Sequence, residues 1–269
     1  SCLVGSEMCI RDSAMVTKCY NTCFAIQNGE EYLLVDAGGG NGILGRMEKA
    51  EIPVDKIHYM FVTHAHTDHV LGVVWVIRKV ATMMRSGAYE GNFKIYCHED
   101  LADTIMQLCT LTLVKKFTVF LGDRILIKKV KDGGEKKAAG MKLTFFDIHS
   151  TKTKQFGFQA RFEDGMVLSC LGDEPYKEVT RPYVEGCDWL LSEAFCLDRD
   201  KEIFHPYEKH HSTALDAGRL AEELHVSNLV LYHTEDTCLE KRKEAYSREA
   251  ALSFHGTVYV PMDLERIRL

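Results

Sequence analysis

Apolar residues recur along the chain in two patterns, one typical of β-strands and one typical of amphipathic helices. Val70, Val73 and Ile77 repeat at the spacing of one helix face, which predicts a long helix. Short apolar runs bounded by turn residues predict strands, and Asn28-Gly29 between two such runs indicates a hairpin. The predicted helices are 42–50, 70–86, 99–109, 213–224 and 239–252. The predicted strands are 16–27, 31–36, 58–63, 93–97, 117–120, 124–130, 141–148, 188–194, 228–232 and 257–260.

The order of these elements indicates the fold class. Strands alternate with helices and hairpins in both halves, and no linker rich in Pro or Ser divides the chain. We therefore predict one α/β (α+β) domain over 14–269, with two mixed β-sheets packed face to face and helices outside. The most polar stretch, 131–140, is predicted to be a solvated turn, with contact to an anionic substrate as the alternative.

Residues 1–13 do not fit this pattern. Their sequence, SCLVGSEMCIRDS, has no basic n-region and no sustained apolar segment, so it is not a secretory signal. It resembles a translated vector or adapter scar, and we expect it to be foreign to the fold. An ordered strand docked here with many buried contacts would contradict this expectation.

Composition excludes several classes of protein. Hydrophobic residues make up 46% and charged residues 27% of the chain, which excludes disordered and fibrous proteins. No apolar run approaches the length of a transmembrane helix, so we expect no membrane partner. The formal net charge of −6 argues against a general binder of nucleic acid, although it leaves room for a local basic patch.

The 10 cysteines give no signal for a metal site or a disulfide framework. None forms a Cys-x-x-Cys pair, and most lie in apolar, strand-like segments such as 93–97 and 166–171. Cysteine in such surroundings behaves as a small buried hydrophobe. We interpret them as reduced core residues of a cytoplasmic protein, and Cys19 and Cys23 are the one pair on a shared strand face.

The strongest chemical signal is the motif His64-x-His66-x-Asp68-His69, which directly follows an apolar strand. Imidazole nitrogens and carboxylate oxygens suit Zn, Mn or Fe(II). Four such side chains at a strand-to-helix turn are directed toward one point. The motif therefore predicts a metal site.

Three further polar residues each stand just after an apolar strand. They are His149, Asp173 and His233. The ends of packed strands converge on one rim, where binding sites form in such sheets. We expect these residues to complete the metal site.

The motif THAHTDH, followed by His149, Asp173 and His233 in that order, resembles the metallo-β-lactamase superfamily over essentially 15–265. The resemblance implies a four-layer αββα sandwich, hydrolase activity and two divalent metal ions, zinc first, with Mn or Fe as alternatives. One metal is then held by His64, His66 and His149, the second by Asp68, His69 and His233, with Asp173 bridging.

Two segments are similar to the ribonuclease Z branch of that superfamily, namely 192–195 (SEAF) and 211–214 (HSTA). The similarity implies that His211 contacts the scissile phosphate, and it makes Glu193 a catalytic candidate. His211 also has a local rationale, because Ser212 or Thr213 can cap the following helix and anions are favoured at a helix N-terminus. A solvent-exposed histidine before a cap is the alternative.

The chain departs from the tRNA-processing members of that branch. Those proteins carry an RNA-gripping arm between the third His ligand and the bridging Asp, whereas the interval from His149 to Asp173 holds a single predicted hairpin. We therefore predict a dinuclear metal-dependent hydrolase that cleaves a small phosphodiester or related ester through a metal-bridging hydroxide. Asp68 is predicted to be both a ligand and the group that orients the nucleophile.

Two rival functions stay open. The first is a ribonuclease Z-type RNA 3′-end endonuclease whose grip comes from 131–140 or from a dimer partner, since the resemblance also implies a homodimer. The second is a metal-binding sensor or scaffold without catalysis. A lactam substrate is not favoured, because the expected Asn/Lys substrate loop is not evident.

Overall fold

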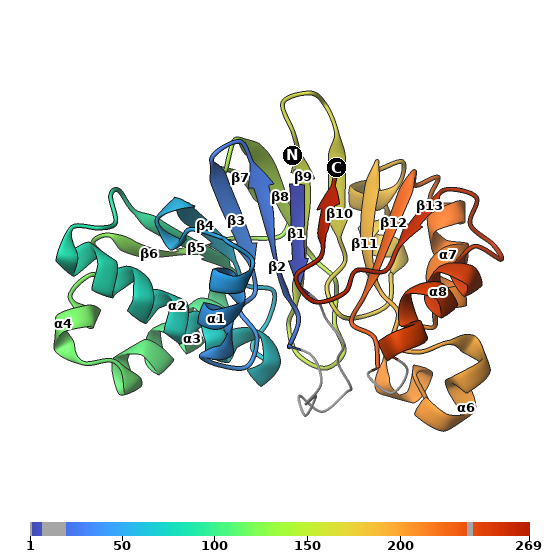
Figure 1. Ribbon diagram of the computed structural model, residues 1–269, viewed down its shortest axis with the longest axis horizontal. Helices are drawn as coiled ribbons and strands as arrows, with labels where there is room; N and C mark the ends of the chain where they lie inside the picture. The colour runs from blue at the N-terminus through green and yellow to red at the C-terminus, as the bar shows by residue number, and fades with distance from the viewer. Residues whose placement is uncertain (1, 7–19, 236–238) are drawn as a thin grey trace.

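The computed structural model describes residues 2–6, 20–235 and 239–269, with the backbone alone described for 2–6. The described strands form two seven-stranded mixed sheets that lie face to face, and helices cover their outer faces (Figure 1). This arrangement confirms the predicted four-layer sandwich. No helix in the described parts combines the length and apolar character that crossing a membrane requires.

The first sheet has the order β14-β1-β2-β3-β4-β5-β6. Its strands are β1 (Cys2–Ser6), β2 (Cys23–Asn28), β3 (Glu31–Val35), β4 (Ile57–Phe61), β5 (Phe93–Cys97), β6 (Ile125–Lys129) and β14 (Arg266–Arg268). The helices on this side are α1 (Gly42–Lys49), α2 (Thr67–Ser86), α3 (Glu99–Thr112) and α4 (Lys115–Thr118). The predicted hairpin is the β2–β3 pair, which turns at Gly29 with a φ of 60°.

The second sheet has the order β13-β12-β11-β10-β9-β8-β7. Its strands are β7 (Glu135–Ala138), β8 (Met141–Asp147), β9 (Phe156–Arg161), β10 (Val167–Cys170), β11 (Trp189–Glu193), β12 (Asn228–Tyr232) and β13 (Thr257–Tyr259). The helices of this half are α5 (Arg181–Val184), α6 (Lys201–Phe204), α7 (Ala214–Glu223) and α8 (Leu239–Ala250). The four 3-10 turns in the described residues are η1 (Val54–Lys56), η2 (Glu178–Thr180), η3 (Asp198–Asp200) and η4 (Tyr207–Lys209).

Three apolar layers hold the sandwich together. The central layer lies between the sheets, where the ring of Phe61 packs 5.1 Å from that of Phe145 and 5.4 Å from that of Phe158, measured between centroids. One outer layer joins the first sheet to α1, α2 and α3, and the other joins the second sheet to α7 and α8. Each fully buried aromatic side chain contributes on the order of 2 kcal/mol to folding, so the strand ends that carry the polar residues are held in fixed positions.

Two predicted elements were wrong. Residues 117–120 are not a strand, because α4 and the turn after it occupy them, with Phe117 buried and Val119 exposed. Residues 131–140 are not all turn, because 135–138 form β7 at the edge of the second sheet. An edge strand with one face in water needs few apolar residues, so the lysines of this segment concealed it.

The first residues of the chain are only partly described. The backbone of residues 2–6 forms β1, which pairs with both β2 and β14. The segment is therefore part of the first sheet. The expectation that it is foreign to the fold also depended on buried side-chain contacts, and these side chains are not described. The interpretation of 1–13 as a non-native scar stays a prediction. Of the cysteine pair noted above, Cys19 lies outside the described residues.

Helix α2 lies directly against the loop that follows β3. The amide of Gly72 donates to the carbonyl of Gly38 at 2.8 Å, and the amide of Ala37 donates to the carbonyl of His69 at 3.1 Å. A Cβ at position 72 would stand 1.9 Å from the carbonyl oxygen of Ala37. Only glycine permits this approach, which brings the start of α2 onto the end of β3.

We therefore expect Gly72→Ala to lower the free energy of unfolding by about 3 kcal/mol, since backbone must move to admit the methyl group. Urea denaturation monitored by circular dichroism measures the change. Gly45→Ala is the matched control, because a Cβ there meets nothing within 4 Å and α1 should gain about 0.5–1 kcal/mol. Equal stability of the Gly72→Ala protein and the parent would contradict the close approach.

Candidate metal centre

Several strands end at one rim of the sandwich, and each is followed by a polar residue. Asp36 follows β3, His149 follows β8, Asp173 follows β10 after a two-residue turn, and His233 follows β12. The backbone is left-handed at Asp36, His149 and His233, with φ values of 55°, 54° and 56°. Such conformations are uncommon outside glycine and concentrate at functional sites.

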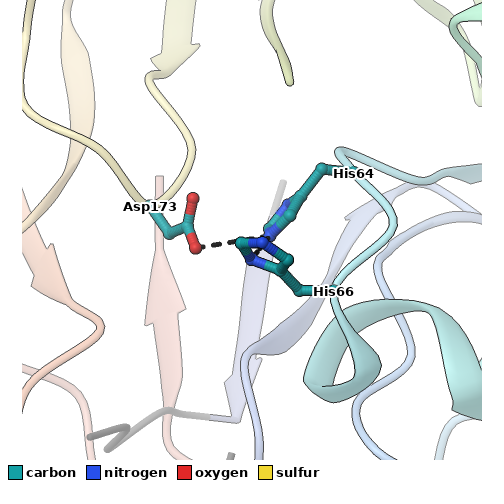
Figure 2. Close-up of side chains that lie close together, drawn as sticks. All are labelled: His64, His66 and Asp173. Carbon is teal, nitrogen blue, oxygen red and sulfur yellow. Dashed lines mark hydrogen bonds and ion pairs between the residues drawn. The ribbon is translucent and has the colours of Figure 1, made fainter. Parts of the chain in front are cut away.

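The first group of candidate ligands is His64, His66 and Asp173. Figure 2 shows the two imidazoles pointing toward the carboxylate of Asp173. The Nε2 atom of His64 lies 2.9 Å from Nδ1 of His66 and 3.4 Å from Oδ2 of Asp173. Burial and the neighbouring His64 lower the pKa of His66, which keeps its imidazole neutral and able to bind a cation.

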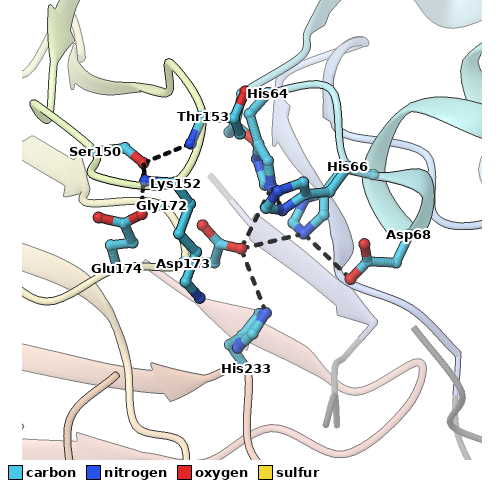
Figure 3. A network of polar contacts seen from close by, with 12 residues as sticks. His64, His66, Asp68, Ser150, Lys152, Thr153, Gly172, Asp173, Glu174 and His233 are labelled. Atoms are coloured by element: carbon cyan, nitrogen blue, oxygen red, sulfur yellow. Dashed lines mark hydrogen bonds and ion pairs between the residues drawn. The ribbon is translucent and has the colours of Figure 1, made fainter. Parts of the chain in front are cut away.

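The second group is Asp68, His69 and His233. Asp68 and His69 lie in the first turn of α2, and His233 approaches from the second sheet (Figure 3). The Nε2 atom of His69 is 3.6 Å from Oδ2 of Asp68. Burial lowers the pKa of His233 to about 3, although the carboxylates of Asp173 and Asp68 act in the opposite direction.

Asp173 stands between the two groups. Its Oδ2 atom lies 3.4, 3.8 and 3.6 Å from the Nε2 atoms of His64, His69 and His233. Burial alone would raise the pKa of this carboxyl, but the surrounding imidazoles hold it well below its usual range. One ionised carboxylate therefore faces ligands of both groups, as the bridging position requires.

The residues present fit two divalent cations. Within each group the three ligand atoms all lie within 4.8 Å of one another. The Nε2 atom of His69 is buried, faces Asp68 and Asp173 at 3.6 and 3.8 Å, and has no hydrogen-bond partner among the described residues. Leaving such an atom unpaired costs about 1–3 kcal/mol, so the centre lacks partners that a bound cation would supply.

Asp36 is a residue of the centre that the sequence analysis did not single out. Its Oδ2 atom accepts from Thr63 Oγ1 at 2.7 Å and lies 2.8 Å from Nδ1 of His69, while Thr63 Oγ1 lies 2.9 Å from Nδ1 of His64. Asp36, Asp68 and Asp173 raise the pKa of His69 to about 9, although burial acts in the opposite direction. A carboxylate that holds the far nitrogen of a ligand histidine fixes its orientation. The signal was available, because Asp36 also follows an apolar strand.

The structure does not bring His149 into either group. His149 is exposed, its amide donates to Asp147 Oδ1 at 2.7 Å, and its carbonyl accepts from the Lys177 ammonium. Its backbone is nevertheless at the predicted rim. Its role as a ligand stays a prediction.

His211 and Glu193 lie together beside the second group. The imidazole of His211 is buried between Phe195 and His233, with centroid separations of 5.0 and 5.1 Å. Its Nδ1 atom is 3.4 Å from Oε2 of Glu193, whose Oε1 accepts from the amide and hydroxyl of Ser212 at 2.7 and 2.6 Å. Glu193 therefore lies on the Nδ1 side of the His211 imidazole.

Thr213 caps α7, because its hydroxyl accepts from the amide of Asp216 and the Asp216 carboxylate accepts from the amide of Thr213. This places His211 at the N-terminus of that helix, as predicted from the sequence. The alternative of an exposed histidine is wrong, since the side chain of His211 is only 1% exposed.

A protein-family model described as Anti-Pycsar protein Apyc1 matches residues 9–255. The chain belongs to this family. Ribonuclease Z of Thermococcus sibiricus (strain DSM 12597 / MM 739) is 24% identical in an alignment that covers 91% of this chain and 89% of the relative.

Two solved structures share the fold. The metallo-β-lactamase fold protein YhfI from Bacillus subtilis superposes with a TM-score of 0.76 at 19% identity, over 99% of this chain and 98% of that one. A diphosphatase from the PhnP family gives 0.74 at 14% identity, over 100% and 98%.

These similarities and the two His/Asp groups together indicate the biochemical class of this chain. It is a metal-dependent hydrolase with the metallo-β-lactamase fold, in the ribonuclease Z-like branch of that superfamily. The interval between His149 and Asp173 contains the β9–β10 hairpin and no further helix or strand. The predicted single hairpin at this position is thus confirmed.

We expect Asp36→Asn to weaken zinc binding by about 10- to 100-fold, because the substitution removes the charge that orients His69. Asparagine tolerates the left-handed backbone at this position, so the fold should persist. Competition with a chromogenic zinc chelator measures the affinity. The exposed Asp123→Asn substitution is the control, and a parent-like zinc affinity of the Asp36→Asn protein would contradict the role.

Proposed function

We propose that this chain is a dinuclear metal-dependent phosphodiesterase that acts on a small substrate. The observation that carries the proposal is the position of Asp173, whose single carboxylate faces imidazole nitrogens of both ligand groups. A hydrolase with one ligand shared between two cations is suited to bonds in which both an attacking and a leaving oxygen develop charge.

The proposed ligands divide between the two cation positions. His64, His66 and Asp173 hold the first, with His149 as its further ligand, and Asp68, His69 and His233 hold the second, with Asp173 shared. Two divalent ions, zinc first and Mn or Fe as alternatives, supply Lewis acidity and lower the pKa of a water molecule toward neutrality when bound.

The remaining chemistry belongs to side chains of the chain itself. Burial would raise the pKa of Asp68, but His69 and His233 lower it, so this carboxylate is ionised and can orient the nucleophile through its second oxygen. His211 stabilises negative charge that develops on an oxygen of the substrate. Glu193 does not contact the substrate in this proposal, and it acts as a positioning residue that holds His211.

The shape and charge of the chain support a small substrate. A single hairpin fills the interval between His149 and Asp173, and the net charge of −6 does not favour the phosphate-backbone contacts on which RNA affinity depends. The buried cysteines of the described residues carry no disulfide, which favours a cytoplasmic enzyme.

An RNA 3′-end endonuclease is the second candidate function. The name of the Thermococcus sibiricus relative favours it, and so do the exposed lysines at 136 and 137 on β7. RNA binding through these lysines requires a further RNA-binding surface, such as one on a second subunit of a homodimer.

A panel of chromogenic substrates tests the proposal. Bis(4-nitrophenyl) phosphate, 4-nitrophenyl phosphate, 4-nitrophenyl acetate, a lactone and a lactam are assayed with protein loaded with Zn or Mn. We expect turnover of the diester that disappears when a chelator removes the metal. Turnover of the lactone alone would contradict the proposal, and metal binding without any turnover would favour the sensor or scaffold.

We expect His211→Ala to lower kcat for the diester by about 10²- to 10³-fold, because it removes a group that stabilises developing charge. The metal content, measured by plasma mass spectrometry, should stay at two ions per chain. The exposed His255→Ala substitution is the control. An unchanged kcat in the His211→Ala protein would remove this residue from the mechanism.

A further inference from the structure

The loop between β8 and β9 is held at several points beside the metal centre. Ser150 Oγ donates to the buried Oε1 of Glu174 at 2.5 Å, and it accepts from the amides of Lys152 and Thr153 at 3.1 and 3.3 Å. Glu174 directly follows Asp173 in the chain. The start of the loop is therefore attached to the segment that carries the shared carboxylate.

Two further contacts fix the loop. The ammonium of Lys177 donates to the carbonyl of His149 and lies 3.6 Å from Oε2 of Glu174. On the opposite side, Thr151 Oγ1 lies 3.2 Å from Nδ1 of His210, next to His211. The loop thus spans the distance from the turn after β10 to the segment that precedes α7.

This anchoring directs the side chain of Lys152 into the centre. Its ammonium nitrogen lies 3.4 Å from Nε2 of His211, the nitrogen opposite Glu193. Figure 3 shows the side chain running beside Asp173 toward the ligand groups. Lys152 is an exposed residue, and its contact with His211 is half-buried, which is the arrangement of a cation at the mouth of a site.

The contact between Lys152 and His211 places a charged hydrogen-bond donor at this side of the metal centre. Nδ1 of His211 lies 3.4 Å from Oε2 of Glu193, and Nε2 lies 3.4 Å from the Lys152 ammonium. The ammonium adds N–H donors and a positive charge beside the imidazole. A phosphodiester carries one negative charge on its two non-bridging oxygens, and a charge-assisted hydrogen bond to such an oxygen is about twice as strong as a neutral one.

We propose that Lys152 is a phosphate-binding residue of this centre, whose ammonium donates to a non-bridging oxygen of the substrate diester beside His211. The inference rests on the proposed function and adds a substrate-binding residue to it. A neutral ester or lactone offers no charge to this ammonium, so the loop between β8 and β9 favours the diester.

Lys152→Met tests the inference, with Lys154→Met as the matched control. Lys154 stands in the same loop, but its ammonium lies 3.6 Å from Asp100 and does not face His211. We expect Lys152→Met to lower kcat/KM for bis(4-nitrophenyl) phosphate and to weaken the binding of inorganic phosphate, each by about 10- to 100-fold. Lys152→Arg should keep most of both, and Lys154→Met should match the parent.

Phosphate affinity is measured by titration calorimetry on the zinc-loaded protein, and zinc content and Tm are measured alongside. Both should equal those of the parent, because Lys152 is exposed. Parent-like phosphate affinity in the Lys152→Met protein overturns the inference, and so does a loss of zinc that accounts for the change. If no variant or parent hydrolyses the diester while Lys152→Met still weakens phosphate, the proposed reaction fails and the anion site stands.

Discussion

One oxygen of Asp173 lies between imidazole nitrogens that come from both sides of the sandwich. His64 and His69 follow β4 of the first sheet, whereas His233 follows β12 of the second, and Asp173 itself follows β10. A buried carboxylate is tolerated only where charge or hydrogen bonds compensate its lost hydration. The contact therefore depends on the two sheets being held at a fixed separation, which the aromatic layer between them provides.

Buried carboxylates also contact the histidines of the centre on the side of each ring that faces away from the ligand groups. Asp36 holds the far nitrogen of His69 on one side, and Glu193 lies behind His211 on the other. The two are connected to the fold in similar ways, because each also accepts from a backbone amide and a hydroxyl, those of Thr63 and Ser212 respectively. Imidazoles that are oriented in this manner lose little freedom when they bind a cation or a substrate oxygen.

The parts of the centre that could be predicted are those that follow a local pattern. An apolar strand followed by a polar residue identified Asp173 and His233, and the dense histidine motif identified the first-sheet ligands. Asp36 obeys the same rule but was passed over, because a single carboxylate beside glycines resembles an ordinary turn. Lys152 had no signal, since a loop without periodicity does not indicate where a side chain is directed. The exposed His149 shows the same limit, because a position at a strand end does not determine the rotamer or the path of the loop after it.

A crystal structure of the zinc-loaded protein, with anomalous scattering recorded at the zinc edge, tests the central claim most directly. Two zinc peaks about 3.5–4 Å apart are predicted. One should lie among His64, His66 and Asp173, and the other among Asp68, His69 and His233, with the carboxylate of Asp173 between them. A single zinc peak, or two peaks that do not share Asp173, would contradict the account.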